Sequence, residues 1–257
     1  MRRLRFLVDP GALDGGAGTV VRLPEEEGRH FRVTLRGRPG MDVHVFDGRG
    51  RGFEGRIESA LPEGVMVTLL AEERESVEPP LEVELLQAYS RDDAFEAVID
   101  HATALGVSSI VPLLVARTQS GGRPPDARRL ARFERIAREA AKLSWRRVVP
   151  RIHAPIAVGE IGLAGSLDLW LDPGAAGGSF VRAIEGAARP FVRIAVGPEG
   201  GFSDEEGARL RACGFLAVAL GPRILRTEHA GPAALAVVMS RWGDLGPIAG
   251  DPRPGDP

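Results

Sequence analysis

The sequence predicts an α/β protein with a small β domain in front of a parallel-sheet domain, over 257 residues. Residues 1–72 hold short apolar runs separated by glycine-rich turns, which is typical of a small β-barrel. From residue 81 onward apolar strand patterns alternate with helical patterns, which is typical of a parallel sheet covered by helices. Two late strands, which we expect to be neighbours in the sheet, run into glycine-rich loops, the usual position of a ligand site in such a sheet.

The elements of the first part follow from these short runs. Strands are expected at residues 5–8, 19–22, 42–47, 52–59 and 65–70. A helix is expected to begin near Pro24, because proline suits a first turn and three glutamates follow where the helix dipole favours negative charge. Residues 73–80 are charged and end in two prolines, so we interpret them as a linker.

In the second part, from residue 81 to residue 245, strands and helices alternate. Strands are expected at residues 81–87, 109–114, 167–171, 192–196 and 215–220, and helices at 92–105, 126–143, 179–187 and 233–242, with Pro232 at the first turn of the last helix. Ser203 and Glu206 form a capping box at the start of a further helix. Residues 246–257 are rich in proline, glycine and aspartate, and we expect a disordered tail there.

Composition limits the class of protein. Hydrophobic residues make up 44% and charged residues 26%, as in a soluble globular protein. The single cysteine, Cys213, excludes an internal disulfide and fits a reducing compartment. Because neither a secretory signal nor a long apolar run is present, we expect a cytoplasmic protein without membrane contact. The histidines lack the spacing of metal ligands, so no metal site is expected.

Charge is distributed unevenly although the net charge is only −2. Between Arg117 and Arg151 eleven basic residues stand against three acidic ones, and between Arg29 and Arg56 seven stand against three. Such stretches attract polyanions, but they are equally typical of a solvated helix face. From charge alone both interpretations stay open.

The two glycine-rich loops are Val-Gly-Pro-Glu-Gly-Gly-Phe-Ser at residues 196–203 and Leu-Gly-Pro-Arg-Ile-Leu-Arg-Thr-Glu-His-Ala at residues 220–230. They match neither a P-loop nor a dinucleotide-binding fingerprint, so a phosphate-cradling nucleotide site is not indicated. In this order and spacing they resemble the ribosomal RNA small subunit methyltransferase E family of SPOUT-class enzymes. Blocks at residues 28–36, 45–50, 102–112 and 140–150 agree with that resemblance.

The resemblance implies a PUA-like barrel, then a SPOUT domain with a trefoil knot within residues 169–242 that holds S-adenosylmethionine. It also implies a homodimer that methylates N3 of a uridine in 16S ribosomal RNA or in the small ribosomal subunit. The cofactor-binding residues it implies are Leu171, Gly197, Pro198, Glu199, Gly200, Gly201, Leu220, Gly221, Ile224, Leu225 and Ala230. The RNA-binding residues it implies are Arg29, Arg32, Arg36, Arg38 and Arg146.

Arg226 is the candidate catalytic residue, because it lies beside the cofactor loop. Uracil N3 must lose its proton before it attacks a methyl group, and a positioned guanidinium stabilises the resulting anion. The alternative is that Arg226 only pairs with Glu199 or Glu228 to brace the loops.

The chain departs from the family pattern at Ala104, Ala116, Leu143 and His229. Two other functions therefore stay open: a SPOUT methyltransferase with a different RNA target, and a non-catalytic RNA-binding protein of ribosome assembly.

Overall fold

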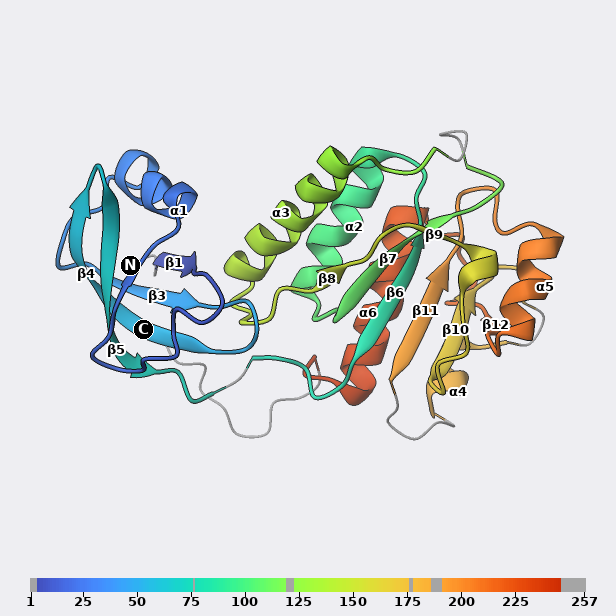
Figure 1. The fold of residues 1–257 in the computed structure, drawn as a ribbon. Helices are drawn as coiled ribbons and strands as arrows, with labels where there is room; N and C mark the ends of the chain where they lie inside the picture. Colours follow the sequence, from blue (N-terminus) through green and yellow to red (C-terminus); the bar gives the residue numbers. More distant parts are fainter. Residues whose placement is uncertain (1–3, 76, 119–122, 176–177, 186–190, 246–257) are drawn as a thin grey trace. The chain divides into compact units, whose positions relative to one another are not determined.

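The computed structural model describes residues 4–75, 77–118, 123–175, 178–185 and 191–245 (Figure 1). The expected tail at 246–257 and the end of the helix expected at 179–187 lie outside these residues. The chain divides into two compact units. The first unit comprises residues 1–78 and 138–149, and the second unit comprises residues 79–137 and 150–257.

The first unit is built on one five-stranded sheet with the strand order β1-β3-β4-β5-β2. Its elements are β1 (Leu4–Leu7), β2 (Val20–Arg22), α1 (Glu25–Arg29), the π-helix η1 (His30–Thr34), β3 (Asp42–Phe46), β4 (Gly52–Leu61) and β5 (Gly64–Glu72). Most neighbouring strands are antiparallel, whereas β1 and β3 are parallel. Inward-facing side chains form one core that includes Phe6, Phe31 and Phe53. The expected strands of the first part are therefore present.

The segment 138–149 belongs to the first unit, whereas the sequence division placed it with the second part of the chain. Lys142 Nζ contacts Glu27 Oε1 at 2.8 Å, and Arg147 Nε contacts Glu73 Oε2 at 3.0 Å. Glu78 accepts a hydrogen bond from the backbone N–H of Arg147 at 2.6 Å. Glu73 and Glu78 lie in the expected linker. The segment 138–149 is therefore held in the first unit by ion pairs and hydrogen bonds between residues far apart in the sequence.

The second unit contains the remaining elements, and α3 contributes residues to both units. They are β6 (Val83–Ala88), α2 (Asp92–Ala104), β7 (Ser109–Leu114), α3 (Ala127–Leu143), β8 (Arg151–Ile152), β9 (Ile156–Ala157), the 3-10 helix η2 (Val158–Glu160), β10 (Leu167–Leu171), α4 (Phe180–Glu185), β11 (Val192–Val196), α5 (Asp204–Ala212), β12 (Leu216–Val218) and α6 (Thr227–Trp242).

The sheet of the second unit is parallel at every described pairing, as the alternation of strands and helices predicts. Its strand order is β12-β10-β11-β6-β7-β8, and β9 also pairs with β7. Side chains alternate between the two faces of β6. Gln87 lies against Gly231 of α6, whereas Leu86 packs in a core with Leu210 of α5. Helices thus cover both faces of the sheet (Figure 1).

Two expectations about the second unit need correction. The last helix begins at Thr227 instead of at residue 233, so Pro232 is its sixth residue instead of part of its first turn. Proline there removes one backbone hydrogen bond, because it has no N–H to donate to the carbonyl of Glu228. The short strands β8 and β9 were not expected, since two residues are too few to show a periodic pattern. The capping box of Ser203 and Glu206 is confirmed.

A buried ion pair joins two central strands. Asp168 of β10 and Arg193 of β11 are register partners, and both are buried. Arg193 Nε donates to Asp168 Oδ1 at 2.8 Å, and Nη1 donates to the carbonyl of Gly162 at 2.9 Å. The hydrogen bond with Asp168 raises the pKa of Arg193. These partners allow the charged guanidinium of Arg193 to be buried in the second unit.

We expect Asp168→Ala to lower the free energy of unfolding by about 3–5 kcal/mol, because the buried guanidinium of Arg193 loses its carboxylate. Urea denaturation followed by circular dichroism measures this change. As a control, Glu205→Ala removes an exposed pair with Arg209 on α5. That change is expected to stay within about 0.5 kcal/mol. Equal effects of the two substitutions would contradict the structural role of the buried pair.

Candidate active site

Three adjacent strands of the second unit end at the same edge of the sheet. β10 lies between β12 and β11, and Leu171 at the end of β10 pairs with Val196 at the end of β11. The first glycine-rich loop follows β11 and the second follows β12. We expected the two loops at the ends of neighbouring strands, but in the sheet β10 separates β11 from β12. The carboxyl ends of the three strands nevertheless provide the kind of edge where open α/β sheets bind ligands.

The first loop, residues 197–203, makes a tight turn. The N–H of Gly201 donates to the carbonyl of Pro198 at 2.9 Å, and Gly201 has φ +67°, a conformation that favours glycine. Pro198 is buried, whereas Glu199 is exposed. A Cβ at Gly201 would have no atom within 4 Å, so the space above this residue is open. The turn offers backbone surface to a ligand.

The second loop, residues 219–226, is open toward solvent. Leu220 is half-buried, and Gly221 has open space around it. Ile224 is 84% exposed and Leu225 is 37% exposed. Two neighbouring apolar side chains are therefore exposed beside a glycine turn.

Arg226 is the residue immediately before α6, and its side chain is 81% exposed. The carboxylate of Glu228 lies 3.9 Å from its Nη1, near the limit for an ion pair. Such a long and exposed contact contributes little to stability. The geometry gives little support to the alternative in which Arg226 braces the loops, and it leaves the guanidinium accessible to a substrate.

Two residues that contact these loops or the start of α6 were not predicted from the sequence. Gln87, near the end of β6, is buried, and its Nε2 donates to the carbonyl of Thr227 at 3.4 Å. The available signal was a polar residue directly after the apolar pair Leu85 and Leu86. Arg117 donates to two carbonyl oxygens of the first loop. In the sequence it was counted only as part of a basic stretch.

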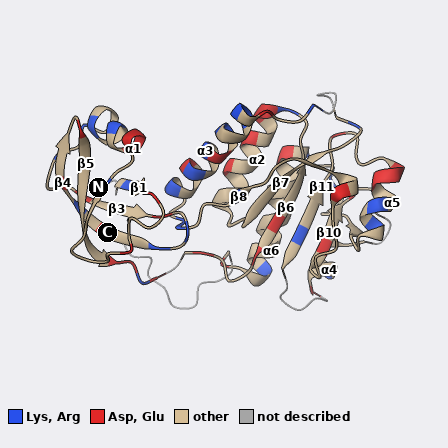
Figure 2. Cartoon of the chain, in the orientation of Figure 1, with Lys and Arg blue, Asp and Glu red and all other residues tan. Residues whose placement is uncertain are grey.

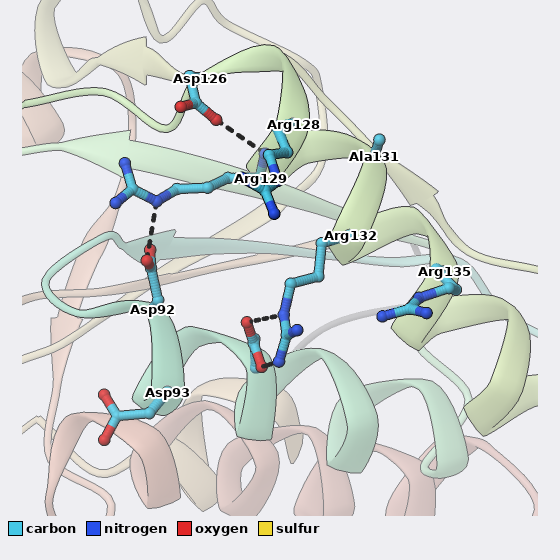
Figure 3. A pocket seen from close by; sticks show the side chains of 9 residues that line it. Asp92, Asp93, Asp126, Arg128, Arg129, Ala131, Arg132 and Arg135 are labelled. Atoms are coloured by element: carbon cyan, nitrogen blue, oxygen red, sulfur yellow. Dashed lines mark hydrogen bonds and ion pairs between the residues drawn. The ribbon is translucent and has the colours of Figure 1, made fainter.

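Part of the basic stretch is paired with carboxylates from other elements. A groove of about 770 Å³ in the second unit lies between α2 and α3 (Figure 3). It is lined by Asp92, Asp93, Glu96, Asp126, Arg128, Arg129, Ala131, Arg132 and Arg135, four basic against four acidic residues. Arg129 Nε contacts Asp92 at 2.8 Å, and Arg132 Nη2 contacts Glu96 at 2.7 Å.

Figure 2 shows these opposite charges on α3 and α2. Asp92 also accepts a hydrogen bond from the hydroxyl of Tyr89. Burial and this bond raise the pKa of Tyr89 to about 12. The groove is therefore an ion-paired contact between two helices and not a strongly positive surface. For this part of the basic stretch, that favours a solvated helix face over a site that attracts polyanions.

The arginines expected to contact RNA differ in exposure. Arg29, Arg36 and Arg38 are exposed on the first unit, while Arg32 is half-buried. Arg146 is buried, with only 5% of its side chain exposed. Its Nη2 and Nε contact Glu78 Oε2 at 2.9 Å and 3.0 Å. This environment does not suit the phosphate contact expected for Arg146, because a carboxylate already occupies the guanidinium.

Among the described residues, His, Cys, Asp and Glu side chains nowhere gather in a group of three that could hold a metal ion. Over the same part of the chain, every helix is too short or too polar to cross a membrane.

Comparisons with known proteins agree on one family. A family model described as an RNA methyltransferase domain matches residues 77–239. Ribosomal RNA small subunit methyltransferase E of Synechocystis sp. is 33% identical over 228 residues, covering 85% of this chain and 72% of the relative. The protein of the same name from Mycobacterium bovis is 32% identical over 240 residues, covering 88% and 89%.

A crystal structure also resembles the chain. Ribosomal RNA small subunit methyltransferase E from Neisseria gonorrhoeae, bound to S-adenosyl methionine, superposes with a TM-score of 0.85 at 30% identity. The match covers 95% of this chain and 100% of that one.

We expect Arg146→Ala to lower the free energy of unfolding by about 3 kcal/mol, because Glu78 loses its guanidinium partner in a buried site. The matched substitution Arg36→Ala removes an exposed arginine of the same unit and is expected to leave stability unchanged. Thermal and urea denaturation of both variants measure the difference. An Arg146→Ala protein of full stability and weakened RNA binding would instead restore the expected phosphate contact.

Proposed function

The chain belongs to the ribosomal RNA small subunit methyltransferase E family, and on that premise we propose that it methylates N3 of a uridine in 16S ribosomal RNA. S-adenosylmethionine would be the methyl donor, as supported by the similar structure from Neisseria gonorrhoeae that contains it. The expected homodimer, the trefoil knot and the cytoplasmic location belong to the same proposal.

One observation carries the proposal of a cofactor site: the end of β10 and the loops after β11 and β12 meet at one edge of the sheet. The residues present fit the cofactor. Open space over Gly201 and Gly221 permits close approach of a flat base, and Leu225 offers apolar surface. Leu171 and Ala230 are half-buried at the border of the site. When bound, the cofactor supplies an electrophilic methyl group on a sulfonium.

Arg226 is proposed to act on the uridine. Its guanidinium would donate hydrogen bonds to uracil oxygens, where negative charge develops as N3 loses its proton. The exposed side chain and its long contact with Glu228 support this role, because an arginine already committed to a buried partner would not be available. Orientation of the reacting atoms would supply much of the remaining rate.

We propose that residues 1–72 form a PUA-like RNA-binding domain and residues 81–245 a SPOUT methyltransferase domain. The exposed residues Arg29, Arg36 and Arg38 would contact phosphates, which positions RNA without reading its sequence. Arg32 would take part if its half-buried side chain turned outward. A uridine within folded RNA must be unstacked before N3 becomes accessible.

A different RNA target is the second candidate function, and a specific observation favours it. All four departures from the family pattern, at Ala104, Ala116, Leu143 and His229, are exposed. Substitutions at the surface change what a protein contacts more readily than how it folds. The departures therefore bear on the identity of the RNA and not on the core.

We expect Arg226→Ala to reduce the rate of methyl transfer about 100-fold or more, since it removes donors that stabilise charge in the transition state. Affinity for S-adenosylmethionine should stay within a few-fold of the wild-type value. Single-turnover assays and calorimetric titration measure these quantities. Arg223→Ala, an exposed arginine of the same loop, is the matched control and should retain activity. Unchanged turnover in Arg226→Ala would remove this residue from the mechanism.

We expect 16S ribosomal RNA from a strain lacking the protein to lack 3-methyluridine at one position. Nucleoside mass spectrometry after nuclease mapping measures the modification, and re-expression of the wild-type protein should restore it. Loss of a different methylated nucleoside would support the second candidate function. An unchanged set of methylated nucleosides, together with an absence of cofactor binding, would favour a non-catalytic protein of ribosome assembly.

A further inference from the structure

The segment after β7, residues 115–118, lies against the first glycine-rich loop. In the sheet, β6 stands between β7 and β11, so the contact joins the ends of two strands that are not neighbours. We propose that Arg117 of this segment is a positioning residue that holds the loop in the shape that binds S-adenosylmethionine. The inference rests on the proposed function.

Two hydrogen bonds carry the proposal. Arg117 Nη1 donates to the carbonyl oxygen of Gly200 at 3.2 Å and to that of Phe202 at 3.3 Å. Both acceptors belong to the loop between β11 and α5, and both are backbone atoms. The arginine thus acts on the path of the main chain, whatever side chains the loop presents.

Gly200 suits this contact. A Cβ at Gly200 would lie 3.3 Å from Cβ of Arg117, so a larger residue would press the loop away from the segment. The loop also holds Gly197 and Gly201, and glycine-rich backbone loses much conformational freedom when it is ordered. A side chain that orders the loop in advance reduces the entropic cost that the ligand would otherwise meet.

A carboxylate makes a second connection between the same two segments. Glu206 Oε1 accepts a hydrogen bond from the backbone N–H of Ala116 at 2.7 Å, and its Oε2 accepts one from that of Ser203 at 2.7 Å. Glu206 therefore caps α5 and ties residue 116 to the end of the loop. Arg117 and Glu206 together hold the loop at both its middle and its end.

Arg117 is exposed, which separates its local role from global stability. Hydrogen bonds at an exposed position contribute little to the free energy of unfolding, because water replaces them when the chain unfolds. Their loss would free the loop and leave the core of the sheet intact. The alternative use of an exposed arginine is a phosphate contact with RNA, which predicts a different kinetic change.

The test compares Arg117→Ala, Arg117→Lys and the control Arg123→Ala, all in the full-length protein. Arg123 is an exposed arginine of the same basic stretch. Calorimetric titration with S-adenosylmethionine alone should give a Kd about tenfold higher for Arg117→Ala, as expected for the loss of two hydrogen bonds from a charged donor. The Kd of Arg117→Lys should lie between those of the wild-type protein and Arg117→Ala, and the Kd of Arg123→Ala should stay within about twofold of the wild-type value.

Kinetics and hydrogen exchange distinguish positioning from other roles. In Arg117→Ala the KM for S-adenosylmethionine should rise with the Kd, while kcat at saturating substrates and the KM for RNA stay near wild-type values. Amide hydrogen exchange in residues 198–203 should become faster, and exchange in α2 should not change. Glu206→Gln should also speed exchange at this loop, which provides a second variant if Arg117→Ala folds poorly.

Several outcomes would overturn the inference. An unchanged Kd for S-adenosylmethionine in Arg117→Ala would remove the residue from cofactor binding. A raised KM for RNA with an unchanged Kd for the cofactor would make Arg117 an RNA contact instead. Absence of cofactor binding by the wild-type protein would reject the proposed cofactor, and the inference with it. If the wild-type protein and Arg117→Ala bind S-adenosylmethionine equally tightly, only the role of Arg117 is rejected and the proposed cofactor stands.

Discussion

The register between β10 and β11 is the constraint on which the site depends. Asp168 and Arg193 are partners in this register, and both are buried. A slip of β11 by one residue would turn its side chains to the opposite face of the sheet, so that Arg193 and Asp168 would each be buried without the other. The same register brings the ends of the two strands level at Leu171 and Val196. The glycine-rich loop therefore starts beside the end of β10, where a ligand could contact both.

The site combines a tied loop with an open one. Three sets of contacts order residues 197–203: a turn within the loop, the capping box of α5, and the hydrogen bonds from Arg117 in the segment after β7. Residues 219–226 instead carry exposed apolar side chains and end in an accessible arginine. Order in the first loop suits recognition of the proposed cofactor. In the second loop, Gly221 and Leu225 are proposed to contact the same cofactor, and only Arg226 at its end is proposed to contact the RNA.

Charge in the chain also divides into two uses. Arg129, Arg132 and Arg147 pair with carboxylates of other elements, and so does the only lysine, Lys142. These residues hold elements together, and the paired carboxylates neutralise their positive charge. Arg29, Arg36 and Arg38 are exposed on the first unit. An excess of positive charge in the sequence is therefore a poor guide to nucleic-acid contact until the positions of its carboxylate partners are known.

The sequence by itself determined the features that depend on neighbours along the chain. The strands of both sheets other than β8 and β9, the capping box of Ser203 and the two glycine-rich loops follow from local periodicity and turn chemistry, and the ordered motifs identified the family. Only the tertiary structure decided that Arg146 is buried against Glu78, that β10 separates β11 from β12, and that Arg117 reaches the carbonyls of Gly200 and Phe202. Each of these contacts joins residues tens of positions apart. Local propensity acts over a few residues, so such pairings arise only when the whole chain packs.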